Sequence, residues 1–130
     1  MKVLVTGSRD YTNEKAIERE LAKLPAGTII VHGACPTGAD AIADKMAMKL
    51  GFKIRRYPAD WDGERAATGS PKAAGPKRNA KLIRDEHPDK DGVPFDLGLA
   101  FTVDMTRSRG TKDCAERARK AGIKVEVIAS

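Results

Sequence analysis

Short apolar runs alternate with amphipathic segments along the chain, and this alternation is the main structural signal in the sequence. Five short runs have the pattern of strands, and the first two are apolar, as is typical of strands buried in a parallel sheet. These runs are Lys2–Thr6, Thr28–His32, Phe52–Tyr57, Phe95–Phe101 and Ile123–Ile128. The third run alternates apolar and polar residues, so we expect it to lie near an edge of the sheet.

Amphipathic segments fill the first two intervals between these runs. Asn13 can cap a helix whose apolar residues recur three or four positions apart. The next segment, residues 39–50, has the best-formed apolar stripe in the chain. Its start at Thr37–Asp40 fits a capping box, which predicts a side-chain cap at this helix N-terminus.

Two further helices are expected in the second half of the chain. Gly75-Pro76 can open a helix that runs to about Glu86. Ser108 or Thr111 can cap the last helix. The buried stripe of that helix is expected to be Cys114, Ala115, Ala118 and Ala121. Residues 58–74 show neither the period of a helix nor that of a strand, which predicts a long loop. Loops of this length are usually functional or disordered.

Strands that alternate with helices imply βαβ units, which build a parallel sheet covered by helices on both faces. Because crossovers are right-handed, few topologies remain. The leading one is a Rossmann-like, doubly wound α/β sheet of about five strands in the order 3-2-1-4-5. The 130 residues match the size of one domain, so we predict a single domain over residues 1–130.

Composition and charge narrow the class of protein. With 41% hydrophobic and 32% charged residues, and no apolar run near the roughly 18 residues of a membrane span, we expect a soluble domain without a membrane partner. The first residues lack the features of a signal peptide, and two cysteines cannot form a disulfide framework, so we expect reduced thiols and a cytoplasmic location.

The charge balance points to an anionic partner. Lys and Arg number 24 against 18 Asp and Glu, a formal net charge of +6. This excess favours phosphate, nucleotide or nucleic acid. Aromatic residues make up only 5% of the chain, which weakens the case for a platform that stacks single-stranded nucleic acid.

Three turns that follow predicted strands each combine glycine with a hydroxyl residue. They are Thr6–Arg9, His32–Asp40 and Arg107–Thr111. In an open parallel sheet, ligands bind outside the carboxyl ends of the strands, where these turns would meet. Glycine lets the backbone approach a phosphate, helix N-termini present unpaired amides, and arginine binds phosphate oxygens. The turns therefore predict a nucleotide or sugar-phosphate site.

Other ligand-binding patterns are missing from the sequence. It contains no Walker A lysine motif and no G-x-G-x-x-G, so neither a P-loop enzyme nor an ordinary dinucleotide site is indicated. No group of His, Cys and carboxylate residues has the spacing of metal ligands. We expect no cofactor and no metal.

Four motifs resemble those of the SLOG superfamily, and most closely its YspA or cpYpsA-related branch. They are Gly7-Ser8-Arg9, His32-Gly33-Ala34-x-x-x-Gly38-Ala39-Asp40, Ala74-Gly75-Pro76-x-Arg78-Asn79 and Ser108-x-Gly110-Thr111. The resemblance covers essentially the whole chain. It implies a Rossmann-like fold that binds nucleotides or nucleotide-derived ligands, assembled as a homodimer or larger homo-oligomer. Relatives in the superfamily include the LOG phosphoribohydrolases, DNA-processing protein A and ligand-sensing domains of bacterial conflict systems.

The sequence departs from the phosphoribohydrolase pattern at the catalytic position. That branch carries Gly-Gly-x-Gly-Thr-x-x-Glu after the fourth strand, and its glutamate assists glycosidic cleavage. By this resemblance Cys114 stands where the glutamate would be, next to Asp113. A thiol that begins a helix near arginine can have a lowered pKa, but it cannot replace a carboxylate beside an oxocarbenium-like centre. The catalytic residue is therefore unknown.

The ligand-binding residues are predicted from these motifs. They are Gly7, Ser8, Arg9, His32, Gly33, Ala34, Thr37, Gly38, Asp40, Arg78, Asn79, Ser108, Arg109, Gly110 and Thr111. Arg9 and Arg78 are the expected phosphate ligands. Because both are expected at exposed positions, alanine there should abolish binding and leave folding nearly intact. Gly110→Val is expected to damage both binding and folding.

Several of these residues have a structural interpretation beside the functional one. His32 at a strand end is more often a satisfied histidine than a general base. Asp40 can be a helix cap as well as an acceptor for a ribose hydroxyl. Trp61 either stacks on a base as a lid or anchors the long loop on the core.

Three functions follow, in order of preference. The first is a protein that sequesters, carries or senses a nucleotide-derived small molecule, such as a nucleoside phosphate, an ADP-ribose-type compound or a cyclic nucleotide. The second is a phosphoribohydrolase that uses Asp113, Asp40 or Glu64 as its carboxylate. The third, favoured only by the net charge, is a module that binds single-stranded DNA. The sequence identifies neither the base nor the number of phosphates.

Overall fold

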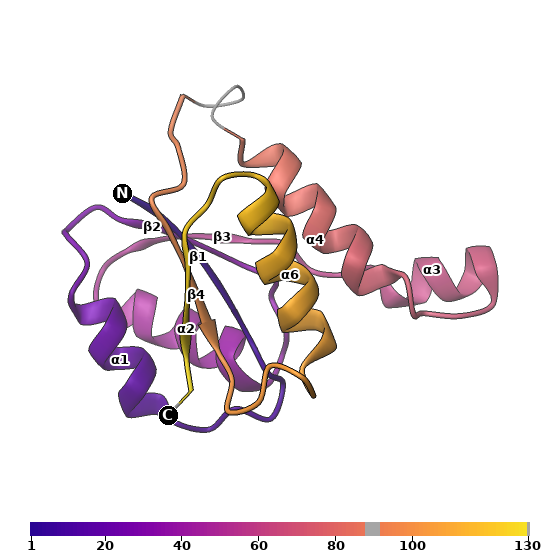
Figure 1. Ribbon diagram of the computed structural model, residues 1–130, viewed down its shortest axis with the longest axis horizontal. Coiled ribbons are helices and arrows are strands. Elements are labelled where there is room, and N and C mark those ends of the chain that lie inside the picture. The colour runs from indigo at the N-terminus through magenta and orange to yellow at the C-terminus, as the bar shows by residue number, and fades with distance from the viewer. Residues whose placement is uncertain (88–91, 130) are drawn as a thin grey trace.

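The predicted α/β architecture is present in the computed structural model, which describes residues 1–87 and 92–129 (Figure 1). Five parallel strands form one sheet in the order β3-β2-β1-β4-β5, so the predicted strand order is confirmed. The strands are β1 (Lys2–Gly7), β2 (Ile29–His32), β3 (Lys53–Arg56), β4 (Leu97–Phe101) and β5 (Val125–Ile128). The alternating strand, β3, lies at one edge as expected.

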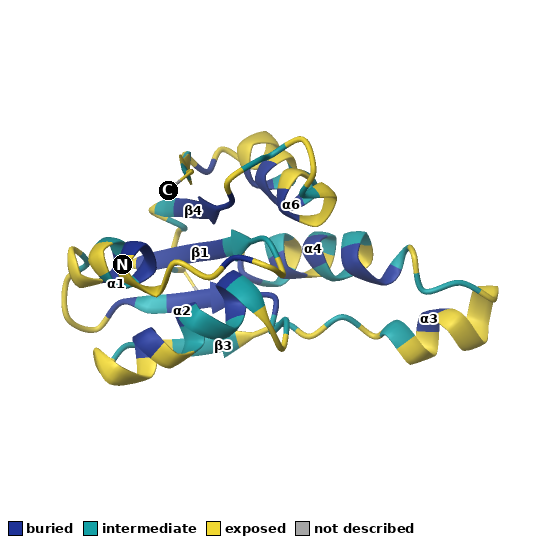
Figure 2. Ribbon diagram, turned by 90° about the horizontal axis from the view of Figure 1, so that it is seen from below, coloured by how far each residue is buried: buried dark blue, intermediate teal, exposed yellow. Residues whose placement is uncertain are grey.

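Helices cover both faces of the sheet, because alternate residues of the central strand point to opposite sides. Val3 and Val5 pack in a core cluster with α1 (Glu14–Ala22) and α2 (Gly38–Lys49). Leu4 packs in a second cluster with α4 (Ala74–Asp85) and α6 (Arg109–Lys120). The sheet is thus the middle layer of a doubly wound fold, and its central strands β1, β2 and β4 are mostly buried in Figure 2.

The segment predicted as an irregular loop contains a helix, so that prediction is wrong. Helix α3 (Trp61–Thr68) begins at Asp60, whose Oδ1 accepts a hydrogen bond of 2.9 Å from the Gly63 amide. It ends at Gly69 in the left-handed conformation. The hydrophobic pattern does not reveal α3, because this helix packs only one side against α4 and its buried residue, Glu64, is charged. In Figure 1 α3 projects from the body beside the start of α4.

Two predicted helix caps are not formed. At the start of α2, Thr37 makes no side-chain hydrogen bond to the helix amides. The Asp40 carboxylate accepts instead from the Cys35 amide at 3.3 Å, so the predicted capping box is wrong. Ser108 precedes α6 but also makes no side-chain cap, because its hydroxyl binds other side chains.

The buried stripe of α6 agrees with the prediction except at its last residue. Cys114, Ala115 and Ala118 are buried as expected. Ala121 is exposed, because α6 ends at Lys120 and Ala121 is already its C-terminal cap. Thr111 takes the remaining buried position, at the start of the helix.

A buried ion pair lies at the amino edge of the sheet. Lys2 Nζ is 3.0 Å from Glu86 Oε1, and the two side chains are 0% and 4% exposed. Arg55 also donates to Glu86 Oε1, at 2.6 Å, and the Tyr57 hydroxyl donates to Oε2. Glu86 follows the last turn of α4, so this cluster ties α4 to β1 and β3.

No helix in the described part of the chain is both long and apolar enough to cross a bilayer.

Candidate functional site

The turn after β1 is packed directly against the start of α2. The Ala39 amide donates to the Ser8 carbonyl at 3.1 Å. Gly38 has φ 73°, and a β-carbon there would overlap the Ser8 carbonyl oxygen and the backbone of Arg9. A β-carbon on Gly7 would overlap the Ala39 side chain and the backbone of β4. Both glycines are therefore required for this close approach.

A chain of hydroxyl groups joins the turn after β1 to the turn after β4. Ser8 Oγ donates to Thr102 Oγ1 at 2.6 Å and lies 2.8 Å from Ser108 Oγ. Ser108 Oγ in turn donates to Thr111 Oγ1 at 2.7 Å. The structure thus brings together Ser8, Ser108 and Thr111 of the predicted site. Thr102 was missed, although its place directly after β4 marks it as an edge residue.

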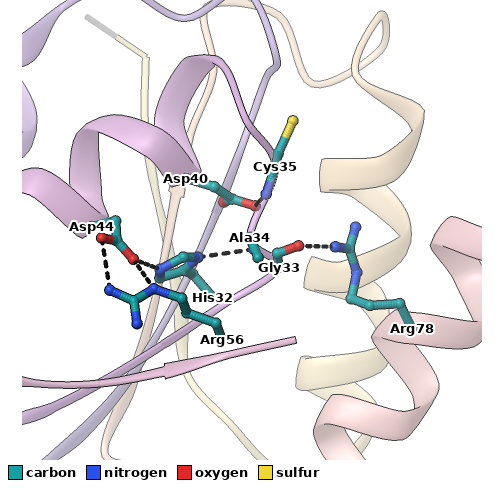
Figure 3. Close-up of polar contacts among 8 residues, drawn as sticks. All are labelled: His32, Gly33, Ala34, Cys35, Asp40, Asp44, Arg56 and Arg78. Atoms are coloured by element: carbon teal, nitrogen blue, oxygen red, sulfur yellow. Dashed lines mark hydrogen bonds and ion pairs between the residues drawn. The ribbon is translucent and has the colours of Figure 1, made fainter. Parts of the chain in front are cut away.

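The turn after β2 is shaped by His32, which is buried (Figure 3). Its Nδ1 accepts from the Ala34 amide at 2.9 Å, and its Nε2 lies 2.7 Å from Asp44 Oδ2. Because Nδ1 accepts, the proton is on Nε2 and is donated to Asp44. Arg56 also binds Asp44, and this contact lowers the pKa of that carboxyl against the effect of burial. Both nitrogens of His32 are engaged, so it positions the turn.

Asp40 is the residue of this region whose bonding is incomplete. It is buried in the first turn of α2, where its Oδ2 accepts from the Cys35 amide. Its Oδ1 is buried and has no hydrogen-bond partner. Burial raises the pKa of Asp40, although His32, the Cys35 amide and Arg78 oppose the rise. Figure 3 shows the carboxylate next to the residue 33–35 turn.

Arg78 lies on α4 and is half-buried, so the expectation of an exposed position with no structural role is wrong. Its Nη1 donates to the carbonyl of Gly33, and also to that of Tyr57 at 3.3 Å. Its Nε donates to Asn79 Oδ1 at 2.8 Å. The Asn79 side chain continues to Asp113 on α6, donating to Oδ2 at 3.0 Å. These bonds join α4 to the turn after β2 and to α6.

Arg9, by contrast, is exposed, as predicted for a turn residue. Its guanidinium carbon is 4.7 Å from the centroid of the Trp61 ring. The same ring is the nearest group to Gly75, at 3.4 Å from where a β-carbon would stand. Trp61 therefore contacts both the predicted phosphate-binding turn and the start of α4, and it anchors the base of α3.

The remaining predicted residues lie at helix starts. Thr37 and Arg109 are exposed, at the starts of α2 and α6. A β-carbon on Gly110 would meet no atom within 4 Å, and its φ is not positive. The expected clash of a β-carbon at Gly110 is therefore wrong, because this part of α6 faces open space. The effect of Gly110→Val on folding and binding stays a prediction.

Two cavities differ in their relation to this edge. The first, of about 210 Å³, is lined by Ser8, Asp10, Tyr11, Thr12, Asn13 and Val103. It opens beside the turn after β1 and includes one predicted residue, Ser8. The second, of about 600 Å³, lies between α4 and α6 and includes none of them. The turns around Gly33 and Gly38 are packed against neighbouring groups rather than around either cavity.

The carboxylates considered for glycosidic cleavage differ in their pairing. Glu64 holds Lys77 with both oxygens, at 2.9 and 2.7 Å. Asp113 accepts from Asn79 and, at 2.9 Å, from Arg117. Of the three candidates, Asp40 alone has a buried oxygen without a hydrogen-bond partner in the described residues. The part of the chain that the structure describes contains no cluster of three or more side chains that could hold a metal ion.

Cys114 is not activated. Burial raises its pKa to about 11, an effect only partly offset by a hydrogen bond with Thr6 and the charge of Arg78. The expectation of a lowered pKa is wrong, because the side chain points into the core beneath α6 rather than to the helix N-terminus. Buried thiols of this kind are inert.

The two cysteines are therefore expected to react at different rates. Iodoacetamide at pH 8 should modify half-exposed Cys35 in the folded protein and leave Cys114 unmodified until the protein unfolds. Mass spectrometry of tryptic peptides, with and without urea, measures this. Equal labelling of both thiols in the folded protein would contradict the burial of Cys114.

Fold and site together describe a Rossmann-like α/β protein whose glycine-rich turns meet at the carboxyl edge of the sheet. A family model for YAcAr, the YspA, cpYpsA-related SLOG family, matches residues 1–63. The chain is also similar to the Gene 61 protein of Mycobacterium phage D29, with 35% identity over 133 residues, covering 95% of this chain and 93% of the relative. The chain belongs to the YspA, cpYpsA-related SLOG family, and the predicted resemblance is confirmed. Membership suggests a function related to nucleotide ligands.

Proposed function

We propose that the protein binds a nucleotide-derived small molecule, with its phosphate at the carboxyl edge of the sheet. The observation that carries this proposal is the contact between Ser8 and Ser108, 100 positions apart, at 2.8 Å. It places the turns after β1 and β4, and with them the starts of α2 and α6, around one point. A nucleotide phosphate is the ligand chemistry that such converging glycine turns and helix N-termini suit best.

Helix starts without side-chain caps support the same conclusion. Neither Thr37 nor Ser108 caps its helix with a side chain. Apart from the Ala39 amide, which donates to the Ser8 carbonyl, amides of the first turns are therefore proposed to bind an anion. Gly110 leaves open space above the start of α6. The dipoles of α2 and α6 add partial positive charge at their N-termini, and Arg9 supplies a full charge nearby.

Holding the ligand unchanged is favoured over turning it over. Asp113 and Glu64 are paired with other side chains, so a phosphoribohydrolase would depend on Asp40. Release of free base from a nucleoside monophosphate, followed by chromatography, tests this second function. Mass spectrometry of the ligand that co-purifies with the protein tests the first. The homodimer implied by the resemblance stays a prediction.

Binding of single-stranded DNA is the least favoured function. Cations of α4 that could contact a phosphate backbone are paired with acids: Lys77 with Glu64, and Lys81 with Asp85 at 3.2 Å. Arg84 also lies near Asp85, at 3.4 Å. Paired cations contribute less to binding a phosphate backbone. Such binding is driven by protein cations that neutralise phosphates and release the counterions bound to them.

Arg9→Ala is expected to weaken binding of the co-purified ligand by about ten- to hundredfold, because a charge-assisted hydrogen bond contributes roughly 1.5–3 kcal/mol. The free energy of unfolding of this variant should fall by no more than about 1 kcal/mol, the contribution of an exposed cation–π contact with Trp61. Titration calorimetry and urea unfolding measure the two effects. Arg9→Lys, which keeps the charge, is the control and should retain part of the affinity.

Arg78→Ala is not a clean probe of binding. It removes the donor from the carbonyls of Gly33 and Tyr57, so part of any loss of affinity would come from a displaced turn. If Arg9→Ala binds like the parent protein, the phosphate is not held at the turn after β1, and the proposed site is misplaced.

A further inference from the structure

One carboxylate oxygen of Asp40, in the first turn of α2, has no hydrogen-bond partner. Oδ1 is buried without a hydrogen bond, in a side chain only 6% exposed. Buried polar atoms are almost always satisfied, so an exception needs an explanation. The other oxygen of the same carboxylate is used, since Oδ2 accepts from the Cys35 amide. The side chain is therefore fixed, with one acceptor left over.

The charges around Asp40 limit what this partner can be. The carboxylate repels a phosphate, so the phosphate itself is not its ligand. A cation already lies close to it, because the Arg78 guanidinium interacts with Asp40 electrostatically. A carboxylate oxygen that is fixed and unshared takes a hydrogen-bond donor, such as a hydroxyl or an amino group.

The position of Asp40 favours a hydroxyl next to a phosphate. Asp40 lies in the first turn of α2, the same turn whose amides are proposed to hold the phosphate. In a nucleotide, the sugar follows the phosphate directly and the base lies beyond it. A β-carbon on Gly33 would lie 3.0 Å from Asp40 Oδ2 and would overlap Arg78. Glycine at this position keeps the backbone, the carboxylate and the guanidinium close together.

We propose that Asp40 accepts a hydrogen bond from a sugar hydroxyl of the ligand, so that the protein selects ribonucleotides over deoxyribonucleotides. This inference rests on the proposed function and deepens it, because it names the class of ligand. Asp40 is a specificity residue in this assignment and takes no part in bond breaking.

The test compares ligands that differ by one hydroxyl group. The probes are the four ribonucleoside 5′-monophosphates, each with its 2′-deoxy and 3′-deoxy counterpart, titrated by calorimetry. The parent protein is expected to bind at least one ribonucleotide about ten- to hundredfold more tightly than one of its deoxy counterparts, as for a hydrogen bond to a charged group. Asp40→Asn should reduce this ratio to severalfold, since a neutral amide makes the weaker bond.

Inorganic phosphate provides a second readout for the variant. Asp40→Asn removes a negative charge near the phosphate, so phosphate should bind as tightly as to the parent protein, or more tightly. This shows that the variant is folded and that its site is intact. Glu18→Gln is the control: it removes one negative charge from α1, where Lys49 lies 3.6 Å away, outside the proposed site, and should keep the ribose to deoxyribose ratio.

Each outcome decides between distinct conclusions. Equal affinity of the parent protein for ribo- and deoxyribonucleotides overturns the inference while leaving the proposed function in place. A ratio unchanged in Asp40→Asn overturns the assignment to Asp40. Affinity that depends on the exocyclic amino group of the base, and not on the sugar, also overturns it. If no nucleotide binds to the parent protein, the proposed function fails, and the inference fails with it.

Discussion

Glu86→Ala is expected to lower the free energy of unfolding by about 3–5 kcal/mol at pH 7, because it removes a carboxylate that pairs with the fully buried Lys2 ammonium. It also removes the acceptor for Arg55 and Tyr57, which join β3 to the end of α4. Urea unfolding followed by circular dichroism measures the loss. Asp85→Ala is the control at the neighbouring position, where the carboxylate pairs with the exposed Lys81 and Arg84, and should cost less than about 1 kcal/mol.

The same cluster predicts a dependence of stability on pH. Burial by itself raises the pKa of Glu86, but hydrogen bonds from Tyr57, Lys2 and Arg55 outweigh it, and the pKa lies below its ordinary value. A carboxyl whose pKa is lower in the folded state stabilises the protein above the unfolded-state pKa and loses this contribution as pH falls. The parent protein should therefore lose stability below about pH 4.5 more steeply than Glu86→Ala. Parallel acid titrations would contradict this role for Glu86.

Gly38→Ala is expected to cost about 2–5 kcal/mol, the sum of two effects at one residue. The left-handed conformation of Gly38 penalises a side chain by roughly 1–2 kcal/mol. Overpacking against the Ser8 carbonyl and the Arg9 backbone adds roughly 1–3 kcal/mol, because backbone cannot move aside as a flexible side chain can. The turn after β1 should shift away from α2, so ligand binding is expected to fall as well.

Gly110→Ala is the control for this prediction. It lies at the equivalent start of α6, with no positive φ and open space around its α-carbon. Its stability should stay within about 1 kcal/mol of the parent protein, or rise slightly, since alanine favours a helix over glycine. Thermal and urea unfolding of both variants test the contrast. Equal losses would mean that the two glycine turns are packed alike, against the observed geometry.

Much of the fold could be predicted from the sequence because its signals are local. Runs such as Thr28–His32 and the stripe of residues 39–50 have the periods of a buried strand and an amphipathic helix. Right-handed crossovers then leave few strand orders, and the observed order β3-β2-β1-β4-β5 is among them. Helix α3 escaped prediction because it buries one residue, Glu64, and that residue is charged.

The sequence predicts where in the fold the candidate site lies, but not which contacts its side chains make. Glycine and hydroxyl residues after β1, β2 and β4 must share one edge of a parallel sheet, so the region follows from the topology. The pattern gave the same weight to Arg9 and Arg78, yet only Arg9 is exposed while Arg78 bonds to the carbonyls of Gly33 and Tyr57. A motif states which residues occur, but not which groups they already satisfy.

The sequence by itself thus determined the class of fold, the order of the strands, the edge that carries the glycine turns and the family. Only the tertiary structure decided that Lys2 pairs with Glu86, that Ser8 meets Ser108, and that one oxygen of Asp40 stays without a partner. The physical reason is the range of the interactions. Periodicity and turn preferences act over a few residues, whereas these contacts join side chains 84 and 100 positions apart or depend on every group packed around one atom.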